Sequence, residues 1–188
     1  MKDHAEAMVL ASFAGDALAL GAHWIYDPER IGWEFGRVAE LQTPRPDSYH
    51  RTKRKGQFTH YGDQTFVLIE SLAACRGFDL SDFAARWRAL FRGYTGYIDK
   101  ATRGTLRNFA EGAGPASAAS PSDDLAGAAR IAPLIFWLRN DPQALSAAVR
   151  SQTAMTHGNP LIADAAAYFA DAALLILGGR TPMAALEA

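Results

Sequence analysis

The apolar residues of this chain recur at helical spacing along almost its whole length. Alanine is abundant, β-branched residues are scattered, and no segment alternates apolar and polar positions as a half-buried strand does. The pattern predicts helices near 4–22, 63–76, 81–95, 98–111, 123–139, 142–155, 160–177 and from 182 onward. The fold class is therefore predicted to be all-α.

Three of these helices begin with the same local signal. Asp141-Pro142, Asn159-Pro160 and Thr181-Pro182 each place a capping side chain before a proline, and proline is favoured at the first helical position. Two segments lack the helical pattern, namely residues 27–62, which open with a turn at Asp27, and the small-residue loop 112–122. A long loop inside a compact domain is usually functional or disordered.

The first predicted helix is apolar nearly all round, which is typical of a buried, central helix. Asp16 lies in its middle, and a buried carboxylate must be paired or hydrogen-bonded. We interpret Asp16 as a structural group that satisfies neighbouring backbone or hydroxyl groups. Asp164 and Asp171 share one face of helix 160–177 and are predicted to be buried, either in a polar interior or against a neighbouring helix.

Length, net charge and cysteine content limit the classes of protein to which the chain can belong. A length of 188 residues fits a single domain, 1–188, with a sizeable core. The net charge of −1 gives no general attraction to nucleic acid or to an anionic membrane. Cys75 is the only cysteine, which fits a reducing compartment. The sequence contains no uninterrupted apolar run of about 18 residues, so no membrane span is expected. We expect a cytoplasmic protein without an export signal.

Candidate chemistry lies at the ends of the predicted helices. His23 and Asp27 follow the first helix as acid–base candidates, although such residues are more often packing and capping residues. A basic loop, residues 45–55, precedes the stretch Tyr61-Gly62-Asp63-Gln64-Thr65. Such a loop beside a helix N-terminus would suit a phosphate-bearing ligand, and the alternative is a solvated loop. Arg130 and His157 are isolated polar residues in apolar surroundings.

Four blocks, in order, resemble the ADP-ribosylglycohydrolase family. Gly15-Asp16-Ala17-Leu18 is similar to the family's opening Gly-Asp-Ala-Leu-Gly helix, and Tyr61-Gly62-Asp63-Gln64-Thr65 falls where the family has Thr-Asp-Asp-Thr. Ala129-Arg130-Ile131-Ala132-Pro133 resembles its Met-Arg-x-Ala-Pro block. Thr156-His157-Gly158-Asn159-Pro160 resembles its Thr-His-x-x-Pro turn.

The resemblance implies a compact, orthogonal all-α bundle in which magnesium ions orient ADP-ribose and a water for hydrolysis of the glycosidic bond. Magnesium takes hard oxygen ligands. The residues implied as metal ligands are Asp63, Thr65 and Gln64. The implied catalytic residues are Asp27, His23 and Asp63, and the implied ligand-binding residues are Arg130, His157, Asn159 and Tyr61. The implied partner is free or protein-attached ADP-ribose, and self-association is a further expectation.

The chain departs from the family pattern at the metal-binding block. Gly62 stands where the family has its first metal-binding threonine, and Gln64 stands where it has an aspartate. The family's last metal motif is expected beyond residue 188, so the chain resembles the N-terminal two-thirds of its relatives. These departures leave two alternatives to hydrolysis: a non-catalytic member with a binding or structural role, and an unrelated all-α interaction domain.

Overall fold

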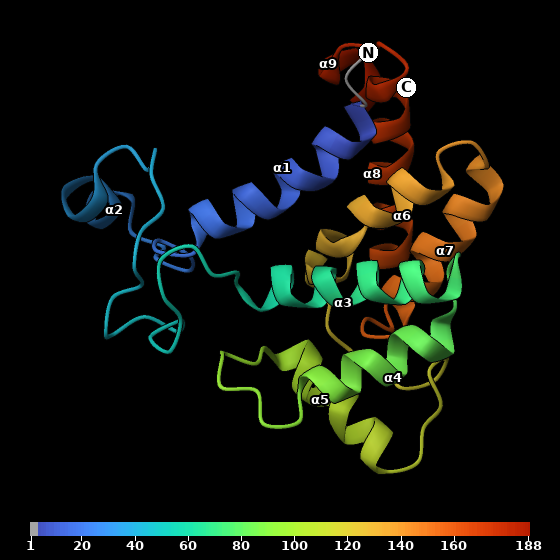
Figure 1. The fold of residues 1–188 in the computed structure, drawn as a ribbon, viewed down its shortest axis with the longest axis horizontal. Coiled ribbons are helices and arrows are strands. Elements are labelled where there is room, and N and C mark those ends of the chain that lie inside the picture. Colours follow the sequence, from blue (N-terminus) through green and yellow to red (C-terminus); the bar gives the residue numbers. More distant parts are fainter. Residues whose placement is uncertain (1–3) are drawn as a thin grey trace.

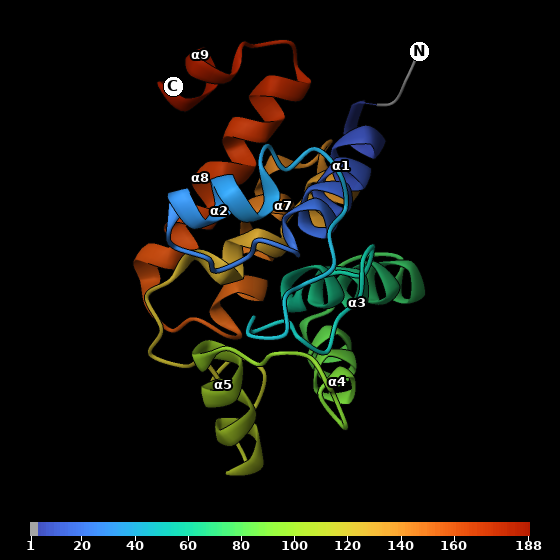
Figure 2. The same ribbon diagram turned by 90° about the vertical axis from the view of Figure 1, so that its left-hand side faces the viewer.

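The protein is built from helices that cross one another at large angles (Figures 1 and 2). The computed structural model describes residues 4–188. In chain order the elements are α1 (His4–Ala19), α2 (Pro28–Phe35), α3 (His60–Cys75), α4 (Leu80–Leu90), α5 (Lys100–Ala110), the 3-10 helix η1 (Leu125–Arg130), α6 (Ala132–Leu138), α7 (Pro142–Ala154), α8 (Pro160–Leu177) and α9 (Pro182–Leu186). Across residues 4–188 the extended pairing is limited to a single parallel bridge between Ser120 and His157. The all-α prediction is confirmed.

The three helix starts predicted from a cap followed by proline are confirmed. The side chains of Asp141, Asn159 and Thr181 accept hydrogen bonds from backbone N–H groups one turn into α7, α8 and α9, and a proline follows each cap. These bonds satisfy N–H groups that have no partner within the helix. Local sequence therefore fixes where these three helices begin.

The prediction was wrong at α2, where only a turn was expected. Asp27 caps this helix by accepting from the N–H groups of Glu29 and Arg30, and Gly36, with a φ of 63°, ends it. The helix has no buried residue and is held by ion pairs of Arg30 with Glu34 and with Asp47. The helix is only eight residues long, which is too short for apolar periodicity to identify it.

The predicted helix 123–139 is divided into η1 and α6. A Cβ atom on Gly127 would lie 2.8 Å from the His157 ring and 2.9 Å from a Thr153 methyl, so the backbone of η1 lies directly against the end of α7 and the turn that follows it. η1 packs against α3, α7 and α8. This close approach is a tertiary feature that periodicity does not report.

The main core lies between two antiparallel helix pairs. α3 packs on α4, α7 packs on α8, and η1 contacts both pairs. In Figure 1, α3 runs across the molecule in front of α8, with α4 and α5 below it. The largest fully buried apolar side chains come from α3, α4, α6, α7 and the turns that follow α1 and α7: Trp87, Phe83, Leu20, Leu68, Leu72, Leu134, Leu145 and Met155.

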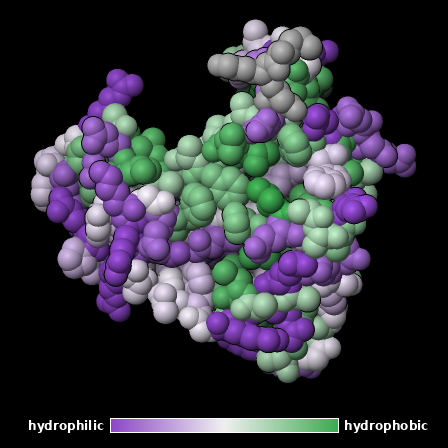
Figure 3. Space-filling view, viewed as in Figure 1, coloured by the Kyte–Doolittle hydropathy of each residue, from purple (hydrophilic) through white to green (hydrophobic). Residues whose placement is uncertain are grey.

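The first helix is not buried on all sides, which corrects the prediction of a buried central helix. Within α1 only Ala5 and Ala17 are buried, and Leu10 is 62% exposed. α1 packs on α6 and α3 with one side. Its other side contributes to the apolar band in the middle of the face shown in Figure 3. Apolar character all round a helix therefore does not ensure that each side is covered.

α8 is similarly apolar and partly open. Among the described residues it is the one helix whose length and composition would allow it to cross a membrane, and about 33% of it is buried within the fold. Core helices pass the same test, so this finding is weak evidence and the expectation of no membrane span stays a prediction. Asp164 and Asp171 are exposed, which corrects the expectation of buried acids, and Asp164 pairs with Arg150.

Candidate functional site

Three of the four sequence blocks line one cavity. Asp16 of α1, Tyr61, Gly62 and Thr65 of α3, and Ala129 of η1 surround a space of about 180 Å³, together with Ser12 and Phe13. α1 and α3 are separated in sequence by a 40-residue segment and meet only through the fold. Polar groups converging on a concave space are the usual mark of a small-molecule site. The fourth block does not line this cavity: His157, Gly158, Asn159 and Pro160 line a different one, together with residues of α7 and α8.

Asp16 joins α1 to the start of α3. Its two carboxylate oxygens accept from the backbone N–H of Thr59, at 2.7 Å, and from the Thr59 hydroxyl, at 2.6 Å. Thr59 is itself the N-cap of α3. Burial raises the pKa of Asp16, and the nearby charge of Asp63 adds to the increase, while the bonds to Thr59 oppose it. The prediction that Asp16 satisfies a backbone and a hydroxyl group is confirmed.

Gly62 allows this contact. A Cβ atom at residue 62 would lie 2.4 Å from Oδ2 of Asp16 and 2.7 Å from Cβ of Phe58. Both distances are too short for any side chain, so α1 and α3 approach this closely only because residue 62 is glycine. The position that the resemblance assigns to a metal-binding threonine is filled by the carboxylate of Asp16.

Asp63 is held by a cation of the chain itself. Its Oδ2 atom accepts from Nζ of Lys53, at 2.5 Å, and from the hydroxyl of Tyr94, also at 2.5 Å. The side chain of Lys53 is 12% exposed and that of Asp63 is 19% exposed, so the pair is largely shielded from water. The ammonium also lies 5.1 Å from the centre of the Tyr94 ring. Burial and the Asp63 carboxylate raise the pKa of Tyr94, which keeps the hydroxyl protonated as a donor.

Gln64 and Thr65 are satisfied within the fold. The Gln64 carbonyl oxygen accepts from Trp87 Nε1 and from Arg130 Nη1, both at 2.7 Å, and its amide donates to the backbone oxygen of His60. The hydroxyl of Thr65 donates to the backbone oxygen of Tyr61 at 2.8 Å. Gln64 therefore points into the core rather than into the cavity, whereas Thr65 lines the cavity.

Arg130 connects three parts of the fold. Its guanidinium is fully buried and donates to Gln64, to the side chain and backbone of Gln152 and to the Thr156 hydroxyl. Burial lowers the pKa of Arg130 to about 10, so the group stays charged at neutral pH. All of these acceptors are neutral. The charges of Asp99 and Asp124, which do not bond to Arg130, act to raise its pKa and so oppose the effect of burial.

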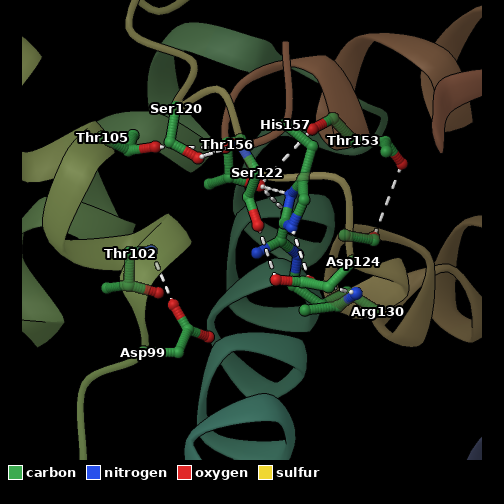
Figure 4. Close-up of polar contacts among 12 residues, drawn as sticks. Asp99, Thr102, Thr105, Ser120, Ser122, Asp124, Arg130, Thr153, Thr156 and His157 are labelled. Atoms are coloured by element: carbon green, nitrogen blue, oxygen red, sulfur yellow. Dashed lines mark hydrogen bonds and ion pairs between the residues drawn. The ribbon is translucent and has the colours of Figure 1, made fainter. Parts of the chain in front are cut away.

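His157 continues the same network (Figure 4). Its Nδ1 lies 2.8 Å from the Thr156 hydroxyl and its Nε2 lies 3.0 Å from Oδ1 of Asp124. The bond to His157 is the largest cause that lowers the pKa of Asp124. Asn159, also predicted to bind a ligand, caps α8 through the N–H of Leu161. The structure thus gives Arg130, His157 and Asn159 contacts that hold loops in place, and none of the three lines the cavity beside Asp16.

His23 and Asp27 do not line that cavity, although the His23 ring packs against Tyr61, which does. Asp27 is exposed and caps α2. Nδ1 of His23 lies 2.6 Å from Nε2 of His50, and the two rings sit in an aromatic cluster that we define as His23, Trp24, Tyr49, His50, His60, Tyr61 and Tyr97. Burial, together with the neighbouring imidazoles, lowers the pKa of His23 to about 4 and that of His50 to about 3. Trp24 adopts a φ of 65°, which is strained for a bulky residue.

The four blocks, taken in order along the chain, agree with the comparison to known proteins. The family model described as ADP-ribosylglycohydrolase matches residues 1–188. This chain belongs to the ADP-ribosylglycohydrolase family. The prediction made from the four blocks is confirmed, and the alternative of an unrelated all-α interaction domain is wrong.

The relatives cover the chain to different extents. Crystallin J1A of Tripedalia cystophora is 30% identical over 107 residues, which are 56% of this chain and 33% of the crystallin. Crystallin J1B of the same organism is 29% identical over 107 residues, with the same coverage. A solved structure titled ADP-ribosylglycohydrolase-related protein complex is 26% identical, with a TM-score of 0.80 over 98% of this chain and 60% of its own. The chain thus spans less than two-thirds of each relative.

The residues that family resemblance implies as magnesium ligands do not fit that ion in this fold. The only charged group among them, Asp63, is neutralised by Lys53 and accepts a hydrogen bond from Tyr94, and the carbonyl oxygen of Gln64 accepts from Arg130 and Trp87. Magnesium requires nearly octahedral oxygen ligation, normally with carboxylate charge. Among residues 4–188, no group of three acidic, histidine or cysteine side chains is placed to hold a metal ion.

Two features of the site were not predicted from the sequence. Lys53 belongs to the predicted basic loop, but its side chain turns inward to Asp63. Elsewhere in that loop Arg45 pairs with Glu34, and Arg54 and Lys55 remain exposed. Tyr94, which follows α4, carried no signal. Contacts between a loop, a helix start and a distant tyrosine depend on the fold, and no short motif encodes them.

Proposed function

We propose that the protein is an ADP-ribosylglycohydrolase-like hydrolase that acts on the glycosidic bond of an ADP-ribosyl group or a related nucleoside-diphosphate-ribose. The observation that carries the proposal is the cavity beside Asp16, where side chains from three family-like blocks converge. Family membership over residues 1–188 supports the class of reaction. In this reading Tyr61 and Thr65 form the wall against which the sugar lies.

A second candidate function is supported by the contacts that Asp63 and Gln64 make within the chain itself. Asp63 is neutralised within the chain, and Gln64 is committed to the core. Two relatives are named crystallins. These observations support a non-catalytic role in which the family fold serves for binding or structure, with the cavity retained.

One experiment distinguishes the two. The chain is titrated calorimetrically with ADP-ribose and, separately, incubated with a mono-ADP-ribosylated protein while released ADP-ribose is measured by chromatography. Release that is lost in Tyr61→Ala, but kept in the matched variant Tyr26→Ala, supports the hydrolase. Tyr26 is a suitable control because it is highly exposed and does not line the cavity.

The other outcomes are equally informative. Binding of ADP-ribose that Tyr61→Ala weakens, without any release, supports the non-catalytic role and contradicts the hydrolase. If the chain neither binds nor releases ADP-ribose, both candidates are contradicted at this cavity.

A further inference from the structure

The contact between Lys53 and Asp63 is largely shielded from water, and the proposed function gives it no role. The carboxylate lies at the position where family resemblance implies a metal ligand. Lys53 comes from the long loop between α2 and α3, ten residues earlier in the chain, and its ammonium reaches the carboxylate at 2.5 Å. A basic residue on a loop usually stays in water, so this inward orientation needs a cause.

The charges around Asp63 supply that cause. The carboxylate of Asp16 lies against Gly62, the residue next to Asp63, and both carboxylates are partly withdrawn from water. Two acids in such a place repel each other unless a cation lies nearby. Lys53 is the cation bonded directly to Asp63.

The surroundings of the ammonium are those of a fixed ion rather than a mobile side chain. Lys53 has three N–H donors, of which one is directed to Asp63, and the charge also faces the ring of Tyr94. Tyr94 in turn donates to the same carboxylate oxygen. The three side chains thus each contact the other two, and they come from a loop, from α3 and from the segment after α4.

We propose that Lys53 is a built-in counter-ion that takes the place of a divalent cation at Asp63. The site is charge-balanced by the chain itself, so the fold and its cavity do not require magnesium. Removing the ammonium while keeping Asp16 and Asp63 would leave two neighbouring carboxylates without a cation, and a divalent ion would then be attracted to them. The proposal concerns charge balance alone and holds whether the protein hydrolyses its ligand or only binds it.

The test compares Lys53→Gln with Lys55→Gln, which removes the same charge from an exposed position two residues away on the same loop. Thermal unfolding is followed with and without magnesium chloride, at ionic strength matched with potassium chloride. We expect magnesium to leave the midpoints of the unmodified chain and of Lys55→Gln unchanged. Lys53→Gln should unfold at a lower temperature, and magnesium should recover part of that loss. The double variant Lys53→Gln with Asp63→Asn should lose the magnesium response.

Two results would overturn the proposal. One is a magnesium-dependent rise in midpoint for the unmodified chain that equals the rise for Lys53→Gln. The other is a folded Lys53→Gln variant that does not respond to magnesium. If Lys53→Gln does not fold, Mn²⁺ is added to the unmodified chain, and the amide resonances of Gly62 and Asp63 are followed by NMR. Unbroadened resonances support a site already filled by Lys53, and selective broadening of these two contradicts it.

Discussion

At the scale of single residues, a few contacts fix how α1 meets α3. Asp16 gives both carboxylate oxygens to Thr59, and Gly62 leaves the space that Asp16 occupies. The same contact closes one side of the cavity. Removing the carboxylate and filling the glycine position should therefore disturb the same junction from its two sides.

Asp16→Ala should lower the free energy of unfolding by about 1–3 kcal/mol, because the buried N–H and hydroxyl of Thr59 lose their acceptor. Urea denaturation measures the change. Asp171→Ala is the matched control, since Asp171 is an exposed helical aspartate for which little change is expected. An unchanged midpoint for Asp16→Ala would show that these bonds contribute nothing to stability.

Gly62→Thr restores the residue type that the family resemblance assigns to this position, yet it should destabilise the chain. The new Cβ would overlap the Asp16 carboxylate, and overpacking of this kind costs typically about 1–3 kcal/mol. Gly15→Ala in α1 is the control, because nothing lies within 4 Å of its Cβ and the loss of a helical glycine is neutral or stabilising. A Gly62→Thr protein as stable as the unmodified chain, measured by urea denaturation, would contradict this packing argument.

At the scale of elements, the aromatic cluster holds the loop 36–59 to its neighbours. His23 follows α1, His50 belongs to the loop, His60 begins α3, and Tyr97 precedes α5. The cluster thus connects segments that are not adjacent in the sequence. The imidazoles of His23 and His50 are neutral in the fold because burial opposes their charge.

This arrangement predicts a loss of stability in acid. The pKa of His23 falls to about 4 and that of His50 to about 3, below their ordinary value of 6.5. The unfolded chain therefore takes up these protons first, so the stability contributed by neutral His23 and His50 is complete above pH 6.5 and decreases as the pH falls from 6.5 toward 3. The other titratable groups facing the pair are His60 and Lys53, whose charges oppose protonation, and Tyr61 and Tyr97. Asp99 lies beyond His60, to which it is bonded.

His50→Gln should flatten the dependence of unfolding free energy on pH between 6.5 and 4, because one of the two suppressed protonations is removed. Urea denaturation at a series of pH values measures the slope. His4→Gln, at an exposed position on α1, is the control and should keep the slope of the unmodified chain. The same slope for His50→Gln and the unmodified chain would show that His50 is not held neutral by the fold.

At the scale of the whole molecule, an apolar band crosses the middle of the face shown in Figure 3. Val9 and Leu10 of α1, Ile69 of α3, and Phe136 and Trp137 of α6 line a groove on the surface of the fold. Large exposed apolar patches mark contact surfaces. The net charge of −1 opposes the approach of a second copy only weakly.

We therefore expect the chain to self-associate through this groove. Sedimentation equilibrium should show a concentration-dependent increase in mass, and Leu10→Arg should shift the equilibrium toward the monomer. Leu125→Arg, at an exposed leucine of η1 outside the groove, is the matched control and should leave the equilibrium unchanged. A chain that stays monomeric across the concentration range would contradict self-association.

The sequence by itself determined the elements whose information is local. The bounds of α8 and the caps of α7, α8 and α9 follow from apolar periodicity, a capping side chain and a proline, all within a few residues of one another. The ordered blocks around Asp16, Asp63, Arg130 and His157 were sufficient to indicate the family, because each block is a short, contiguous motif.

Only the tertiary structure decided what those blocks do. Whether Asp63 faces a metal or a lysine depends on how the loop before α3 folds back, and whether Gln64 faces the cavity or Arg130 depends on where η1 packs. The exposed side of α1 likewise depends on which helices are present to cover it. Charge balance and burial are set by contacts between residues far apart in the chain, and a pattern of neighbouring residues does not contain them.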